Sequence, residues 1–307
     1  MARCFVTRRL PGDALERLAA AHDVDVWDGE MPPAPKELLK GARDAEGLLC
    51  LLTDSVDAEL IAACPRLRVI SNYAVGTDNV DLAAAAARGI PVGNTPDVLT
   101  EATADLAFAL MLAAARRVVE ADAWVRGGRW RTWDPGLLLG ADVHGAVFGI
   151  VGMGRIGGAV ARRAAGFAME VLDLRGLHGL ERCDFVSLHA PLTEETQGLI
   201  GEPELRRMKD TAILVNTARG PLVDPLALEG ALREGWIAAA ALDVTDPEPL
   251  PANHPLLSAP NLVIAPHIGS ASHGARARMA ELAVDNLLAG LAGRPLPHEV
   301  AVTRPAP

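Results

Sequence analysis

Three charged or titratable side chains in the second half of the chain have the types and positions of an acid–base group. Arg219, Glu248 and His267 each stand in a loop that follows a predicted buried strand. Because open α/β sheets bind ligands beyond the carboxyl ends of their strands, we expect the three side chains to converge on one crevice. Taken singly, each also suits a plainer role, as a surface cation, a solvated turn carboxylate and a hydrogen-bonded loop histidine.

A glycine-rich turn precedes these three residues. The apolar run Ala146–Val151 ends in Gly-x-Gly-x-x-Gly and continues into a predicted helix, whose free N–H groups and dipole favour phosphate. Although glycine clusters also mark ordinary turns, this order of strand, turn and helix is typical of a dinucleotide site, in which the glycines permit the tight turn, the approach of the pyrophosphate and the packing of helix on strand. Asp173, 21 residues beyond the first glycine, suits the ribose. The predicted cofactor contacts in the turn are Gly152, Met153, Gly154, Arg155, Ile156 and Gly157.

A nicotinamide enzyme that acts on a carbonyl needs a proton donor, a group that orients the donor, and a cation. His267 suits the donor, and Glu248 can accept from its other ring nitrogen and favour the imidazolium. Arg219 can polarise the oxygen and grip a carboxylate with its planar fork. This combination selects 2-oxo acids over simple ketones.

Short apolar strands that alternate with helices position these residues, which predicts an α/β protein with doubly wound parallel sheets. In the first unit we expect helices at 13–21, 36–42, 57–63 and 81–88, and strands at 3–7, 24–27, 47–52, 68–71 and 90–92. In the second unit, after the turn, we expect strands at 170–174, 185–188, 212–216, 239–244 and 262–265.

Two further segments lie outside this alternation. Residues 97–117 predict one long helix that is apolar almost all round, so that it is buried on more than one side. The glycine- and proline-containing loop that follows holds Trp130 and Trp133, which pack either on their own chain or at a subunit interface. Residues 272–291 predict a helix that leads the chain back to the first unit.

The nucleotide sheet has one abbreviated edge. Only nine residues, Arg175–Cys183, lie between Leu174 and Asp184, whereas a crossover with its helix takes at least about 10–12 residues. Residues 178–183 have the length of one helical turn, so a full helix is not expected there.

Composition excludes several classes of protein. The 307 residues suffice for two domains of about 150 residues each. A formal net charge of −10 argues against a broad nucleic-acid interface, which needs a basic face. The longest apolar run, 106–115, is shorter than the roughly 20 residues that span a bilayer, and no secretory signal is visible. Four scattered cysteines without metal-ligand spacing indicate reduced thiols in a cytoplasmic protein and no metal site.

A family resemblance covers nearly the whole chain. The sequence resembles the D-isomer-specific 2-hydroxyacid dehydrogenases, and most closely their glyoxylate reductase/hydroxypyruvate reductase branch. Several motifs in the family's order carry the resemblance, namely Val75–Asp81, Thr95–Ala104, Gly152–Gly157, His189–Thr193 with Thr196, Asn216–Gly220, Asp246–Pro251 and Pro266–Ser270.

The resemblance implies roles for individual residues. Arg219, Glu248 and His267 become the catalytic residues. Backbone N–H groups around Val75 and Gly76 are implied to bind the substrate carboxylate, with Leu52 and Thr53, and with Arg219, on the substrate side. Further cofactor contacts are implied at Thr103, Pro191, Thr196, Thr217, Ala218, Asp243 and Gly269.

The resemblance also implies an architecture. A Rossmann-type nucleotide domain, residues 97–270, is inserted into a flavodoxin-like substrate domain made of residues 1–96 and 271–307. The long helix and the tryptophan loop then form a dimer arm, so a homodimer is expected.

The abbreviated edge departs from the family pattern, because relatives carry an additional helix and strand there, beneath the adenosine half of the cofactor. Asp173 suits the ribose 2′-OH of NAD(H), whereas Arg175 is nearer the strand end, where a cation accommodates the 2′-phosphate of NADP(H). The branch resemblance favours NADP(H).

Three other functions stay open at this point. A 3-phosphoglycerate dehydrogenase without a regulatory domain shares the same motifs. A non-catalytic nucleotide-sensing protein, like the family's corepressors, fits the abbreviated edge but not the retention of all three catalytic positions. The formate dehydrogenase branch fits less well, because it carries glutamine at the position of Glu248.

Overall fold

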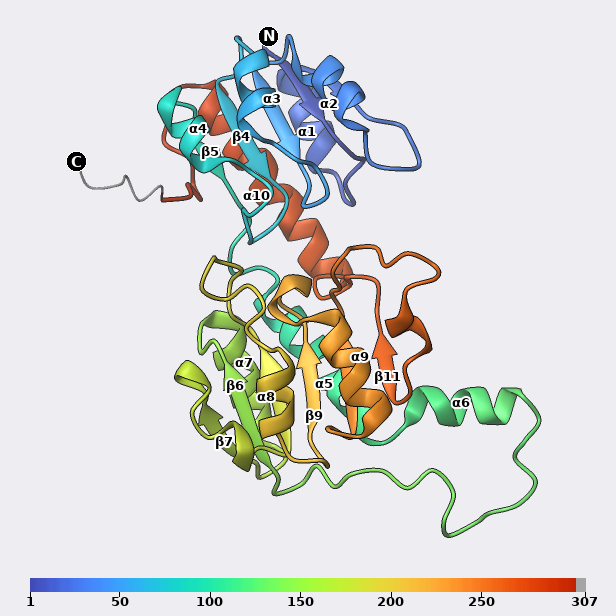
Figure 1. The fold of residues 1–307 in the computed structure, drawn as a ribbon. Coiled ribbons are helices and arrows are strands. Elements are labelled where there is room, and N and C mark those ends of the chain that lie inside the picture. Colours follow the sequence, from blue (N-terminus) through green and yellow to red (C-terminus); the bar gives the residue numbers. More distant parts are fainter. Residues whose placement is uncertain (302–307) are drawn as a thin grey trace. The chain divides into compact units, whose positions relative to one another are not determined.

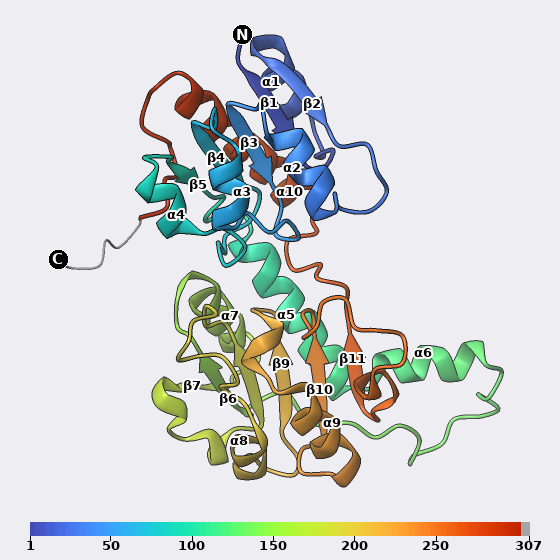
Figure 2. The same ribbon diagram turned by 45° about the horizontal axis from the view of Figure 1, so that its top comes forward.

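The computed structural model describes residues 1–301, which form two compact units (Figures 1 and 2). Unit 1 comprises Met1–Leu99 and the chain from Ala271 onward, and unit 2 comprises Thr100–Ser270. Each unit contains one all-parallel sheet, so the predicted α/β class with parallel sheets is correct. Residues 302–307, which were predicted to belong to the first domain, lie outside the described residues.

Unit 1 has a five-stranded sheet of order β2-β1-β3-β4-β5. Helix α10 packs on β3 and β4 and on α1, and the Ser71 hydroxyl on β4 donates to the carbonyl of Ala283 at 2.8 Å. The C-terminal helix therefore returns to the first unit, as expected. The strands are β1 (Arg3–Val6), β2 (Asp23–Val26), β3 (Gly47–Cys50), β4 (Val69–Asn72) and β5 (Val92–Gly93). The helices are α1 (Ala14–Ala21), α2 (Pro35–Ala42), α3 (Ala58–Ala63), α4 (Leu82–Ala87) and α10 (His273–Leu291).

Unit 2 has a six-stranded sheet of order β11-β10-β9-β8-β6-β7. Successive strand side chains point to opposite faces, so Phe185 joins the apolar core around α5 and α7, whereas Val186 joins the core around α8 and α9. The strands are β6 (Val147–Val151), β7 (Glu170–Asp173), β8 (Phe185–Leu188), β9 (Ile213–Asn216), β10 (Ala239–Leu242) and β11 (Leu262–Ile264). The helices are α5 (Thr100–Ala115), α6 (Val118–Arg126), α7 (Arg155–Ala165), α8 (Glu202–Arg207) and α9 (Pro225–Glu234).

The expected single helix over residues 97–117 is wrong in extent. Helix α5 ends at Ala115, Arg117 adopts the left-handed conformation with φ of 52°, and α6 then begins at Val118. Helix α6 carries no buried residue within the described chain, and it extends away from the sheet of unit 2 (Figure 2). Trp130 and Trp133 are 62% and 78% exposed, so they do not pack on their own chain.

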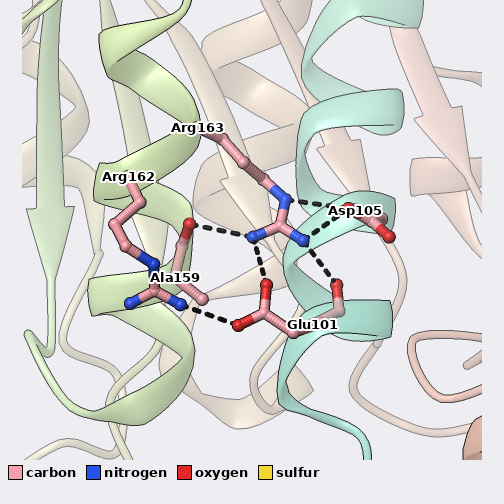
Figure 3. Close-up of polar contacts among 5 residues, drawn as sticks. All are labelled: Glu101, Asp105, Ala159, Arg162 and Arg163. Carbon is pink, nitrogen blue, oxygen red and sulfur yellow. Dashed lines mark hydrogen bonds and ion pairs between the residues drawn. The ribbon is translucent and has the colours of Figure 1, made fainter.

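Ion pairs join α5 to α7, which carries the glycine turn at its start (Figure 3). The Arg163 guanidinium donates to the carboxylate of Asp105 at 2.8 Å and also pairs with Glu101 at 2.8 Å. Arg162 pairs with the second carboxylate oxygen of Glu101 at 2.7 Å. Hydrogen bonding to Arg163 lowers the pKa of Glu101 despite an opposing desolvation effect. The pairs fix α7 against the helix that bears Thr103.

Within residues 1–301, none of the helices is both long and apolar enough to cross a membrane.

Candidate active site

The glycine turn joins β6 to α7 and leaves open space at one position. Gly152 has φ of +91°, and a Cβ there would lie 2.6 Å from the backbone nitrogen of Ala190. A Cβ on Gly157 would lie 2.2 Å from the carbonyl oxygen of Gly152. A Cβ on Gly154, the N-cap of α7, would meet no atom within 4 Å. Two glycines are therefore required by the fold, while the space at Gly154 fits a pyrophosphate on a helix N-terminus.

The predicted cofactor residues Met153, Arg155 and Ile156 belong to the same turn. Arg155 and Ile156 form the start of α7, and the side chain of Met153 is exposed.

The segment after β7, at the edge of the sheet, is short, as predicted. Strand β7 is the edge strand, and two single 3₁₀ turns, Arg175–Leu177 and Leu180–Arg182, replace a crossover helix. Asp173 ends β7, and Arg175 donates from Nε to its carboxylate at 2.8 Å. The two candidates for ribose recognition are thus one ion pair, in which the Arg175 side chain is 88% exposed.

His267 and Glu248 are in direct contact. His267 Nδ1 lies 2.6 Å from a carboxylate oxygen of Glu248, and the backbone N–H of Thr245 donates to the other oxygen at 3.3 Å. Burial raises the pKa of Glu248, but the hydrogen bond and charge of His267, together with the charge of Arg219, outweigh burial and lower it. Glu248 is therefore held as a carboxylate against the ring.

Asp243, which directly follows β10, organises the loop that carries His267. Its backbone carbonyl accepts from the N–H of His267 at 2.8 Å, and its two carboxylate oxygens accept from the N–H groups of Ile268 and Gly269, each at 2.7 Å. Burial raises the pKa of Asp243, and these backbone hydrogen bonds oppose the rise. The contacts hold His267 in a left-handed conformation with φ of 53°.

The loop after β9 places Arg219 beside the loop of Glu248. Asn216 is fully buried, accepts from the N–H of Ala218 at 3.0 Å and donates to the carbonyl of Arg219 at 2.8 Å. A Cβ on Gly220 would lie 1.9 Å from the carbonyl oxygen of Thr245, so the two loops are in backbone contact. The structure therefore brings Arg219, Glu248 and His267 together at one edge of the sheet.

Several predicted cofactor neighbours lie in the same unit. Thr103 on α5 is 4% exposed, and its methyl group would be 3.3 Å from a Cβ on Gly269. The carbonyl of Pro191 accepts from the hydroxyl of Thr196 at 2.7 Å in the loop after β8. Thr217 is 7% exposed, and its hydroxyl has no hydrogen-bond partner within residues 1–301. An unpartnered buried hydroxyl after β9, at the same strand-end edge of the sheet as the glycine turn after β6, fits a bound dinucleotide.

Four of the five predicted substrate residues belong to unit 1, and the fifth, Arg219, belongs to unit 2. Leu52 and Thr53 follow β3, and Val75 and Gly76 follow β4. The carbonyl of Val75 accepts from Asn94 at 2.8 Å, and that of Gly76 accepts from Asn72 at 2.9 Å. These side-chain amides fix the backbone of the predicted carboxylate-binding loop.

Three residues that shape the site had no role predicted from the sequence. Asn216 and Gly220 position Arg219, and the visible signal was a polar residue and a glycine at the end of an apolar strand. His189 follows β8, accepts or donates a 2.9 Å hydrogen bond with Ser187, and has a pKa lowered by burial to about 4. Its backbone carbon would lie 2.7 Å from a Cβ on Gly152, so it supports the turn.

Metal ligation has no support in residues 1–301, where no group of three or more His, Cys, Asp or Glu side chains could hold an ion.

Known proteins resemble the chain along nearly its full length. The family model described as D-isomer specific 2-hydroxyacid dehydrogenase, NAD binding domain, matches residues 108–176 and 177–269. The two matches adjoin inside the abbreviated segment. A glyoxylate reductase of Korarchaeum cryptofilum is 51% identical, with 99% of this chain and 98% of that protein covered. A glyoxylate reductase of Aeropyrum pernix is 50% identical, with 97% and 95% covered.

Solved structures share the fold. The TT0316 protein from Thermus thermophilus superposes with a TM-score of 0.91 at 53% identity, covering 97% of this chain and all of that chain. An NADPH-dependent glyoxylate/hydroxypyruvate reductase from Sinorhizobium meliloti, solved with NADP and malonate, gives a TM-score of 0.85 at 33% identity, covering 98% and 97%.

Proposed function

Because the chain belongs to the D-isomer-specific 2-hydroxyacid dehydrogenase family, we propose that it reduces glyoxylate and hydroxypyruvate to the D-2-hydroxy acids with NAD(P)H. It is an NAD(P)-dependent oxidoreductase of 2-oxo acids. The observation that carries the proposal is the 2.6 Å contact of His267 with Glu248 beside the charge of Arg219. Glyoxylate and hydroxypyruvate are chosen because relatives at about half identity are named glyoxylate reductases and one structural neighbour reduces both acids.

The catalytic residues supply the proton and the electrostatic support. The nicotinamide, when bound, supplies the hydride that adds to the carbonyl carbon. His267 donates a proton from Nε2 to the carbonyl oxygen, because Nδ1 is engaged by Glu248. Glu248 fixes the ring and balances the charge of the imidazolium. Arg219 holds the substrate carboxylate and polarises the carbonyl, so that hydride and proton together complete the alcohol.

The cofactor assignment rests on unit 2. The turn Gly152–Gly157 suits the pyrophosphate of the cofactor. Asp243, Thr103 and Thr217, with the other cofactor neighbours described above, suit its nicotinamide half. Arg175 beside Asp173 favours NADP(H), in agreement with the NADPH dependence of the Sinorhizobium meliloti enzyme. Unit 2 is thus the proposed nucleotide domain.

Unit 1 is the proposed substrate domain. Backbone N–H groups of Val75 and Gly76 suit the substrate carboxylate, because their loop is fixed by asparagine side chains. Leu52 and Thr53 line the same strand-end edge.

Oxidation of NADH and of NADPH should be followed with a panel of 2-oxo acids. We expect turnover with glyoxylate and hydroxypyruvate, and their failure as substrates would overturn the assignment. Faster turnover of 3-phosphohydroxypyruvate would instead favour a 3-phosphoglycerate dehydrogenase. A nucleotide-sensing protein is the second class, supported by the abbreviated edge, and it requires that the chain bind NAD(P)H and turn over none of the acids.

A homodimer in the cytoplasm completes the proposal. The exposed Trp130 and Trp133 follow a helix without buried residues, which suits a subunit interface. All four cysteines are buried and unpaired, which suits a reducing compartment. Sedimentation should give twice the 32.2 kDa chain mass, and Trp133→Ser should shift it toward the monomer. Met31→Ser, at an exposed residue of unit 1, is the control. A wild-type monomer at micromolar concentration would refute the dimer.

A further inference from the structure

Unit 1 contains a pocket of about 590 Å³ at the carboxyl ends of β1, β3 and β4. It is formed entirely within this unit, by loops that follow the three strands and by the start of α10. The residues that matter for its chemistry are Arg8, Arg9, Leu51, Tyr73, His273 and Arg276.

The pocket is basic in an acidic protein. Three arginines line it, and no Asp or Glu of the described chain is among its lining residues, whereas the whole chain has a net charge of −10. The neighbouring acid Asp54 is 3% exposed and accepts from the Leu51 N–H at 2.7 Å and from the Thr7 hydroxyl. Local positive charge in a concave site concentrates anions.

The arginines are held in different ways. Arg8 donates to the carbonyls of Gly29 and Glu30, which anchors its guanidinium. Arg276 is half-buried, and its backbone carbonyl accepts from the Tyr73 hydroxyl at 2.8 Å, which ties the first turn of α10 to the loop after β4. The N-terminal dipole of this 19-residue helix adds to the positive potential.

The pocket shares its edge of the sheet with the proposed substrate residues. Leu51 directly precedes Leu52 and Thr53, and Tyr73 lies two residues before Val75. A 2-oxo acid whose first carboxylate is held at Val75 and Gly76 would therefore have a second, basic site within the same unit.

We propose that this pocket binds the distal phosphate or carboxylate of a 2-oxo acid longer than glyoxylate. The proposal rests on the proposed function, because it places the first carboxylate at the loop after β4. Its arginines form charge-assisted hydrogen bonds to the distal group, with the planar fork that suits both kinds of oxyanion. Dicarboxylic and phosphorylated 2-oxo acids are thus the substrate class that the pocket adds.

Binding of inorganic phosphate, followed by ³¹P NMR titration of the full-length protein, tests the pocket directly. Arg276→Gln should weaken the binding of phosphate by about tenfold or more, which is the loss of affinity expected when a hydrogen bond between charged groups is removed. Arg278→Gln, on the same helix but outside the pocket lining, should leave the affinity unchanged. Arg9→Gln, at an exposed side chain, gives the same test if Arg276→Gln fails to fold. Equal affinity in wild type and both pocket variants would overturn the proposal.

Kinetics separate a substrate group from a free anion. Arg276→Gln should lower the ratio of kcat/KM for 2-oxoglutarate or 3-phosphohydroxypyruvate to kcat/KM for glyoxylate by about tenfold. Weakened phosphate binding with an unchanged ratio would refute the substrate assignment in favour of a site for free anions. Arg276-dependent phosphate binding without turnover of any 2-oxo acid would refute the proposed function and leave the anion site standing.

Discussion

Alanine substitutions in the glycine turn should separate a glycine needed by the fold from one needed by the ligand. In Gly157→Ala the new Cβ lies 2.2 Å from the carbonyl oxygen of Gly152, so the helix must shift, at a cost of about 1–3 kcal/mol of unfolding free energy. In Gly154→Ala the Cβ meets no atom within 4 Å, so stability should change by less than about 0.5 kcal/mol. The methyl group nevertheless occupies the space assigned to the pyrophosphate. We expect NADPH to bind about tenfold more weakly, equivalent to about 1.4 kcal/mol.

Thermal unfolding and fluorescence titration with NADPH measure these two effects separately. Gly158→Ala is the matched control, because Gly158 lies on the same helix and its Cβ would also be free of neighbours. It should keep cofactor affinity and gain up to about 1 kcal/mol in stability from helix propensity. Wild-type NADPH affinity in Gly154→Ala would show that the turn does not hold the pyrophosphate. Wild-type stability in Gly157→Ala would refute the packing argument.

Two further predictions concern the adenosine side and the response to acid. Arg175→Gln should weaken the binding of NADPH by about tenfold and the binding of NADH much less, because only NADPH carries the 2′-phosphate. Equal losses of affinity for the two cofactors in fluorescence titration would contradict this. Asp173→Asn should weaken the binding of NADH more than the binding of NADPH. Because burial lowers the pKa of His189 from 6.5 to about 4, the unfolded chain binds the additional proton, and stability should fall as the pH drops from 6.5 toward 4. The change in unfolding free energy between pH 7 and pH 4.5, measured with denaturant, should be larger in wild type than in His189→Gln by at most about 3 kcal/mol. An identical change in the two proteins would refute the argument.

The sheets and their strand-end loops follow from local patterns. Apolar runs such as residues 185–188 and 213–216 have strand length, are fully buried, and alternate with helical segments, so their parallel pairing was predictable. The rule that ligands bind beyond strand ends then predicted one crevice for Arg219, Glu248 and His267. The structure brings them together, and their catalytic roles are the proposal made above.

Other features depend on contacts that the sequence does not display. Helix α6 was not predicted, because it begins directly after Arg117, where the predicted helix ends, and no glycine or proline separates it from α5. The need for Gly220 arises from a carbonyl 25 residues later in the chain, at Thr245. The basic pocket joins Arg9 to Arg276, which are far apart in sequence and meet only because α10 returns to unit 1.

The single-turnover rate of glyoxylate reduction by His267→Gln tests the central claim most directly. Loss of the proton donor should slow reduction by about 10²–10⁴-fold, while the dissociation constant of NADPH stays near the wild-type value. His144→Gln, at an exposed histidine of the same unit, is the control and should react at the wild-type rate. A wild-type rate in His267→Gln would contradict the assignment of His267 as the acid.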